Sequence, residues 1–358
     1  MLSPNSSRSN RLPLITAMTN MVISKIGIEP PWNSEGITQH QKAFEKVKVR
    51  HPKINAAFER IHRMIGPHSG TNIVLLVGPT GVGKSTLAHL LEAKILSENH
   101  DLIEADTSLV PIVCVEAEET GQKSTPWWVF YSAVGRALNE PLMHRKVDTR
   151  KVDSRLSIVP QTTSDIVSLR KSVEFAMKER KTVALIIDEA AHLLQSNPTY
   201  LQKDFNALKS FCNQNQVTLI VVGSYDLFDI LALSAQIMRR TQIVHVDRYM
   251  VGTPADELAF KKTLQALQAS MPITTIPDLS KFAKSLQKQT LGCIGSLQET
   301  LARMLTNVLH ASGEFEMAHL ENALLTDAQL ESMLAETLKG ENMVTRHSHK
   351  KRLIAEEE

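Results

Sequence analysis

The sequence is poor in cysteine, and its cysteines are far apart. The chain of 358 residues contains only Cys114, Cys212 and Cys293, and no two of them form a C-x-x-C pair. A disulfide framework and a zinc knuckle built from cysteines alone are therefore excluded. Such sparse cysteine use is typical of proteins of a reducing cytosol, and we expect a cytoplasmic location.

Long apolar runs and a large net charge are also missing. No apolar run approaches the roughly 18 residues that a membrane-spanning helix needs, so we expect no membrane segment. The formal net charge is only +2, so any surface that attracts nucleic acid must be local. With 42% hydrophobic and 22% charged residues, the composition is that of a globular protein large enough for an α/β domain with a helical appendage.

Acidic side chains are absent from the first 28 residues, whose only basic residues are Arg8, Arg11 and Lys25. This composition faintly resembles an organellar transit peptide. Because so few residues are basic, and because prolines, serines and asparagines break any periodicity, we predict a flexible arm over residues 1–37 instead.

A glycine-rich stretch at residues 78–86 is the most specific motif of the chain. It has the spacing G-x-x-x-x-G-K-[ST], follows the apolar run 73–77 and precedes a helix-like segment, which is the context of a phosphate-binding loop. Glycines allow positive φ and close backbone approach, and the following helix contributes unpaired N–H groups. Lys84 can reach the β- and γ-phosphates, and the Ser85 hydroxyl can ligate magnesium. The predicted nucleotide-binding residues of this loop are Gly78, Pro79, Thr80, Gly81, Val82, Gly83, Lys84, Ser85 and Thr86.

Two carboxylates, Asp188 and Glu189, follow the apolar run 182–187. Such an uninterrupted run is typical of a central parallel strand buried on both faces. In a doubly wound sheet the end of this strand lies beside the phosphate-binding loop. We predict that Asp188 binds the nucleotide's magnesium together with Ser85, and that Glu189 is the base that polarises the attacking water.

Other polar residues come next to the last two predicted strands, 217–222 and 242–246. Ser224 can hold the attacking water or sense the γ-phosphate, with a plain strand-end serine as the alternative. Arg239 and Arg240 precede the last strand, where a ring-forming ATPase offers an arginine finger to the nucleotide of its neighbour. Two surface arginines at a helix C-terminus are the alternative.

Residues 144–155, HRKVDTRKVDSR, hold five lysines and arginines and almost nothing apolar, so they predict a loop. A solvated connection and a strip of contacts to DNA phosphates both fit this composition. An aromatic stripe precedes the loop, at Trp127, Phe130 and Tyr131, and we interpret it as core-facing rather than base-stacking.

The remaining pattern predicts the domain organisation. Residues 38–250 form an α/β nucleotide-binding domain with a parallel sheet flanked by helices. No strand pattern follows residue 250, and apolar residues at helical spacing predict a small all-helical lid over residues 253–312. Residues 313–358 are expected to form short helices and then a disordered polar tail.

The order of these motifs resembles the AAA+ P-loop ATPases. Within them, the stretches HPKINAAFERIHRMI, IIDEAAHL and LGCIGSLQETL resemble the TnsC/TniB group of transposition regulators, with MuB-like proteins as more distant relatives. The similarity covers about residues 45–310. One departure is that Gly295 stands where many AAA+ lids carry a sensor arginine, and Arg303 comes two turns later.

The resemblance implies an ATPase of the prokaryotic cytosol, with ATP and Mg²⁺ as cofactors. Such a protein assembles as a hexamer-like ring or helical filament around double-stranded DNA without reading its sequence, and it bridges a target selector and a transposase. By this resemblance, the residues that contact DNA are Lys123, Ser124, Arg150 and Lys151. Two alternatives stay open: an ATPase switch that binds protein partners without DNA, and a DNA motor or clamp-loader-type ATPase.

Overall fold

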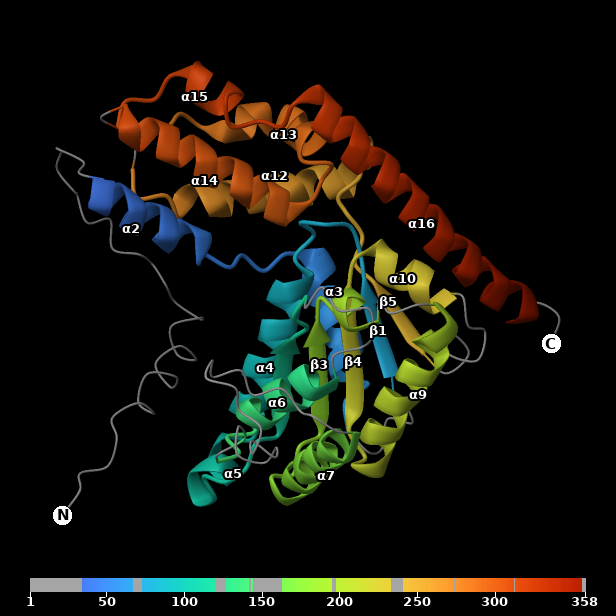
Figure 1. Ribbon diagram of the computed structural model, residues 1–358. Coiled ribbons are helices and arrows are strands. Elements are labelled where there is room, and N and C mark those ends of the chain that lie inside the picture. Colours follow the sequence, from blue (N-terminus) through green and yellow to red (C-terminus); the bar gives the residue numbers. More distant parts are fainter. Residues whose placement is uncertain are drawn as a thin grey trace, which may run out of the picture. The chain divides into compact units, whose positions relative to one another are not determined.

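The computed structural model describes residues 34–66, 73–119, 127–141, 143, 163–194, 198–232, 241–273, 275–311 and 313–355 (Figure 1). The strands are β1 Ile73–Val77, β2 Ile112–Glu116, β3 Ala184–Asp188, β4 Thr218–Gly223 and β5 Gln242–His245. The helices before residue 250 are α2 Ser34–Glu45, α3 Pro52–His62, α4 Lys84–Glu98, α5 His100–Ala105, α6 Trp127–Ala137, α7 Thr163–Glu179, α8 Ala191–Leu194, α9 Pro198–Gln214 and α10 Tyr225–Ala232. After it come α12 Pro254–Ala269, the 3-10 helix η2 Leu279–Phe282, α13 Ala283–Gln289, α14 Ile294–His310, α15 Met317–Glu321 and α16 Asp327–Ala355.

The chain divides into two compact units. The sheet unit lies within residues 50–248 and 327–358, and the helical unit lies within residues 1–49 and 249–326. This division differs from the predicted segments at both ends. The reason is packing: α2 contacts α14 of the helical unit, while α16 contacts α10 of the sheet unit.

The four strands predicted at residues 73–77, 182–187, 217–222 and 242–246 are present. Together with β2 they form one parallel sheet with the order β2-β3-β4-β1-β5. The strands β1 and β4 are completely buried because helices cover both faces of the sheet (Figure 1). On one face α3 and α4 pack, with α4 contacting β2, β3 and β4. Near-continuous apolar strands are what such two-sided burial requires.

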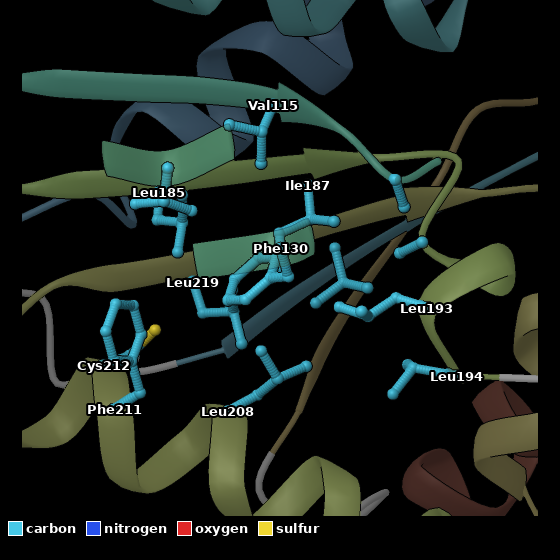
Figure 2. Packing of buried hydrophobic residues seen from close by; sticks show 14 of the residues in the cluster. Val115, Phe130, Leu185, Ile187, Leu193, Leu194, Leu208, Phe211, Cys212 and Leu219 are labelled. Atoms are coloured by element: carbon cyan, nitrogen blue, oxygen red, sulfur yellow. The ribbon is translucent and has the colours of Figure 1, made fainter. Parts of the chain in front are cut away.

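The opposite face of the sheet packs against a cluster of apolar side chains from α6, α7, α8 and α9. Figure 2 shows Leu185, Ile187 and Leu219 of the strands meeting Phe130 of α6 and Phe211 of α9. In α6, Phe130, Tyr131 and Val134 are buried, and Trp127 packs at the edge of the cluster. The aromatic stripe is therefore part of the core, as predicted, and is not a platform for bases.

The helical unit has its own core. Its buried residues include Phe260 and Leu264 of α12, Leu297 and Leu301 of α14, and Phe44 of α2. The amide of Gln298 in α14 donates to the carbonyl oxygens at the end of α2 and just after it, those of Phe44, Glu45 and Val47, at 3.1, 3.1 and 2.8 Å. These bonds satisfy carbonyl groups that a helix end leaves unpaired.

Two separate helices, α2 and α3, precede the first strand. Pro52 is the first residue of α3, and the preceding His51 is extended, with φ −134° and ψ 158°. A residue before proline is sterically driven out of the helical region, so the two helices cannot be continuous. His51 is also buried, and burial together with the charge of Lys53 lowers its pKa to about 4.

The C-terminal helix is longer than the sequence predicted. A polar tail was expected after Gly340, whereas α16 continues through it to Ala355. Gly340 lies against the buried ring of Tyr225, which leaves no room for a side chain. Beside it, the guanidinium of Arg248 forms two bonds to the Glu341 carboxylate, at 2.8 and 3.2 Å. Packing and this ion pair hold the middle of α16 on the sheet unit. No helix among the described residues is long and apolar enough to cross a membrane.

Substitution of Gly340 by alanine tests this packing. An added Cβ would lie 2.1 Å from the Tyr225 ring, so α16 or the ring must shift. Although alanine favours a helix over glycine by about 1 kcal/mol, we expect Gly340→Ala to lower the free energy of unfolding by about 1–3 kcal/mol. Urea denaturation measures the difference. Leu338→Ala, at a side chain on the same helix that is 44% exposed, is the control and should change stability little. A more stable Gly340→Ala variant would contradict the packing.

Candidate functional site

The parallel sheet brings the ends of its strands to a common edge. The loop of residues 78–86 begins directly after β1, and Val77 of β1 pairs with Gly223 of β4, directly before Ser224. On the other side of β4, Ile187 pairs with Val221, so Asp188 ends β3 at almost the same level. The phosphate-binding loop, Asp188, Glu189 and Ser224 therefore lie at one edge of the sheet, as the sequence predicted.

The loop has the backbone that its glycines permit. Gly81 and Gly83 have φ of 75° and 103°, in the left-handed region that favours glycine. Gly78 is required for a different reason, because a Cβ there would lie 2.7 Å from the carbonyl oxygen of Val246, just beyond β5. The sequence predicted the loop but not this close approach of β5.

Lys84, the first residue of α4, is the cation of the site. Its side chain is buried, and its ammonium group donates to the carbonyl oxygens of Gly78 and Pro79, both at 3.0 Å. The loop therefore curls around this charge. Ser85 follows at the exposed surface of the first turn of α4. A cation inside a loop of backbone N–H groups at a helix N-terminus is an arrangement that suits phosphate.

The two acidic residues adopt a strained turn. Glu189 has a φ of 46°, which is uncommon for a residue with a side chain. Its N–H donates to Oδ1 of Asp188 at 2.9 Å, and the N–H of Ala190 donates to the carbonyl oxygen of Val222 at 3.0 Å. These bonds hold the turn against the end of β4, and both carboxylates are only half-buried.

The donor set fits a magnesium nucleotide. Mg²⁺ prefers oxygen ligands, and the Ser85 hydroxyl and Asp188 carboxylate are the oxygen ligands that the motif places at this edge. A third carboxylate, Glu116, pairs with Asp188 across β2 and β3. The carboxyl ends of the strands can therefore carry a cation between phosphate groups and carboxylates.

Several predicted residues lie outside the described part of the chain. These are the arginines predicted as a finger, Arg239 and Arg240, and the residues predicted to contact DNA, Lys123, Ser124, Arg150 and Lys151. Their roles stay predictions.

A group of residues that the sequence did not indicate lies next to Ser224. The hydroxyl of Tyr225 is hydrogen-bonded to Nε2 of His245 at 2.8 Å, and Nδ1 of His245 lies 2.7 Å from Oδ1 of Asp247. This contact to His245 lowers the pKa of Asp247 below its usual range. These three side chains link the end of β4 to the end of β5, the two strands that flank β1. No motif signalled it, because its members are separated in sequence and are joined only by sheet pairing.

The two residues considered for the sensor position of the lid, Gly295 and Arg303, both lie on α14. Gly295 lies in the first turn of α14. Arg303, further along this helix, donates to the carbonyl oxygen of Ala323 at 3.0 Å and to the Thr300 hydroxyl at 3.3 Å. The guanidinium of Arg303 thus fastens the loop after α15 to α14.

Comparison with known proteins agrees with this geometry. Residues 67–231 match the family model of an AAA domain. The Orc1 protein of Aeropyrum pernix, solved in complex with DNA, has a similar structure, with a TM-score of 0.57, 13% identity, and coverage of 79% of this chain and 68% of that chain. The ORC2 protein of the same organism, solved in ADPNP and ADP complexes, gives a TM-score of 0.52 at 13% identity, with 79% and 70% covered. No curated protein matches the sequence significantly.

These similarities and the sheet order establish an AAA+ P-loop NTPase fold with a helical C-terminal region, which confirms the predicted fold class. At 13% identity, the similarity to these solved structures shows the fold of this chain and nothing about its function.

Gly78→Ala tests the geometry of the loop. A Cβ would push the loop and the Val246 carbonyl apart, so the carbonyl cradle around Lys84 must open. We expect at least tenfold weaker binding of a fluorescent ATP analogue, about 1.4 kcal/mol, measured by titration. Ser97→Ala, at an exposed residue near the end of α4, is the control and should leave binding unchanged. Unchanged binding by Gly78→Ala would mean that the loop does not hold the phosphates.

Proposed function

We propose that the protein is an ATPase and that it regulates DNA transposition by assembling on target DNA in its ATP-bound state. The observation that carries the ATPase proposal is the joint placement of Lys84, Asp188 and Glu189 at one edge of a parallel sheet. The AAA domain match over residues 67–231 supports it.

The residues at the carboxyl ends of the strands have separate roles in the proposed hydrolysis of ATP. Lys84 holds the β- and γ-phosphates once its bonds to the loop carbonyls are exchanged for phosphate oxygens. Ser85 and Asp188 hold Mg²⁺, which when bound neutralises charge that develops on the phosphate oxygens. Glu189 orients the attacking water and accepts its proton, because its half-buried carboxylate follows the magnesium ligand directly.

Two further roles complete the proposed site. Ser224, at the end of β4 and level with the loop, contacts the attacking water or the γ-phosphate. Arg239 or Arg240 of a neighbouring protomer supplies positive charge to the transition state. Hydrolysis then depends on oligomerisation, and it serves to release the assembly from DNA.

The role in transposition is supported by sequence resemblance. The stretches 51–65, 186–193 and 291–301 resemble TnsC/TniB proteins, and a solved structure of similar fold, Orc1 of Aeropyrum pernix, is a complex with DNA. Sequence-independent contact to the DNA backbone, by Lys123, Ser124, Arg150 and Lys151, suits a target regulator. A target selector and a transposase are the protein partners in this proposal.

Glu189→Gln tests the assignment of the base. The amide keeps the size and hydrogen bonding of the side chain but cannot accept the proton, so we expect kcat for ATP to fall about 100-fold or more while ATP binding is kept. Lys84→Ala should lose binding itself. Steady-state phosphate release and nucleotide titration measure the two effects separately, and Glu119→Gln, at an exposed carboxylate after β2, is the matched control. Equal losses of binding and hydrolysis in Glu189→Gln would place Glu189 in a structural role.

DNA binding is tested by retention of random-sequence duplex at increasing salt. With a non-hydrolysable ATP analogue we expect binding whose logarithm falls linearly with the logarithm of the salt concentration. The double variant Arg150→Ala/Lys151→Ala should reduce that slope by about 1–2, whereas Lys171→Ala, at an exposed lysine of α7, should not.

The same samples separate the alternatives. Electron microscopy should show rings or filaments on the DNA. A chain that stays monomeric and binds no duplex, while still hydrolysing ATP, would favour a switch acting on protein partners. Separation of the strands of a labelled duplex during ATP hydrolysis would favour a motor.

A further inference from the structure

Three side chains with metal-binding atoms meet on the sheet unit, and none of the three is assigned to the nucleotide. His89 and Glu92 are one turn apart on α4, and Cys114 lies in the middle of β2, against which α4 packs. One ligand atom of each lies within 4.8 Å of the others, and Nδ1 of His89 is 3.6 Å from Oε2 of Glu92. The three residues come from segments that only tertiary packing brings together.

The spacing suits a small tetrahedral ion. Zinc binds thiolate sulfur at about 2.3 Å and nitrogen or carboxylate oxygen at about 2.0–2.2 Å. Two ligands at tetrahedral angles on such an ion are therefore roughly 3.3–3.8 Å apart. The distance between His89 and Glu92 already lies in this range. The Cys114 sulfur lies within 4.8 Å of a ligand atom of each, so a gap of about an ångström remains. Rotation of the His89 and Glu92 side chains can close this gap.

The ligand types favour zinc over magnesium. Mg²⁺ prefers oxygen ligands in octahedral geometry, whereas thiolate and imidazole select borderline ions such as Zn²⁺. Burial raises the pKa of the Cys114 thiol to about 12, and the charges of Glu92, Asp188 and Glu116 add to the rise, so a bound metal ion must displace the thiol proton.

Solvent can deliver the ion. The side chain of His89 is 64% exposed and that of Glu92 33% exposed, while Cys114 is half-buried at the base of the cluster. A structural site needs an entry path of this kind, and water can fill the fourth position.

We propose that His89, Glu92 and Cys114 form a zinc site that joins α4 to β2. α4 begins with Lys84, and β2 is the outermost strand of the sheet, beside β3. The ion therefore connects the helix that follows the phosphate-binding loop to the outermost strand. The site does not depend on ATP hydrolysis or on DNA, so its test is independent of the proposed function.

Cobalt titration of the reduced full-length chain without nucleotide tests the proposal. Co²⁺ replaces Zn²⁺ and gives a sulfur-to-cobalt charge-transfer band in the near ultraviolet only when a thiolate is a ligand. Cobalt held by the oxygen ligands of the nucleotide site gives no such band. We expect one equivalent of Co²⁺ to produce the band and one equivalent of Zn²⁺ to remove it.

Variants assign the ligands. Cys114→Ser should abolish the band, and His89→Ala and Glu92→Gln should weaken Co²⁺ binding at least tenfold. His100→Ala is the matched control, because His100 pairs with Glu104 at 3.3 Å on α5 in a similar exposed pair that involves no cysteine. Cys212→Ala is the control for the thiol, since Cys212 is buried in the core and should leave the band unchanged. A band that survives in Cys114→Ser, or no band in the unchanged chain, would overturn the proposal.

A second readout covers variants that fold poorly. Zn²⁺ should raise the midpoint of thermal unfolding of the unchanged chain, because a ligand that binds the folded state stabilises it. The shift should disappear in His89→Ala, whose exposed side chain can be removed without disturbing the core, and should persist in His100→Ala. An equal shift in both variants would show that zinc binds elsewhere.

Discussion

The parallel pairing of β1 between β4 and β5 is the constraint on which the site depends. Parallel strands end at the same edge, so the loop after β1 meets the polar residues after its neighbours. The approach is close enough that Gly78 has no space for a side chain beside the Val246 carbonyl. The packing of the sheet thus sets the geometry of the phosphate-binding loop.

Packing also decides to which unit each end of the described chain belongs. The first helix, α2, belongs to the helical unit, and the last, α16, belongs to the sheet unit. The α2 helix buries Phe44 in the core of the helical unit, and α16 fits Gly340 against Tyr225 in the sheet unit. Tyr225 directly follows Ser224 and is hydrogen-bonded to His245, so α16 rests on the residues that flank the proposed site.

The elements with a strong local pattern could be predicted from the sequence. All five strands and the phosphate-binding loop have apolar runs or fixed glycine spacing, which depend on neighbours in the chain. The continuation of α16 through Gly340 could not be predicted, because glycine is a poor helix former and the contacts that hold the helix there, to the Tyr225 ring and from Arg248 to Glu341, come from distant parts of the sequence. The Tyr225, His245 and Asp247 contacts and the cluster around Cys114 were also invisible, since their members come from separate segments.

The sequence by itself determined the chemistry of the principal site: a lysine in a glycine-rich loop, a hydroxyl after it, and two carboxylates after a buried strand. These are local patterns, and a strand, turn or helix start is set largely by the residues within it. The tertiary structure alone decided which strands are neighbours, why Gly78 must be glycine, where α2 and α16 pack, and that His89 and Glu92 meet Cys114. Such contacts arise when distant apolar faces are buried together, and no local spacing records that pairing.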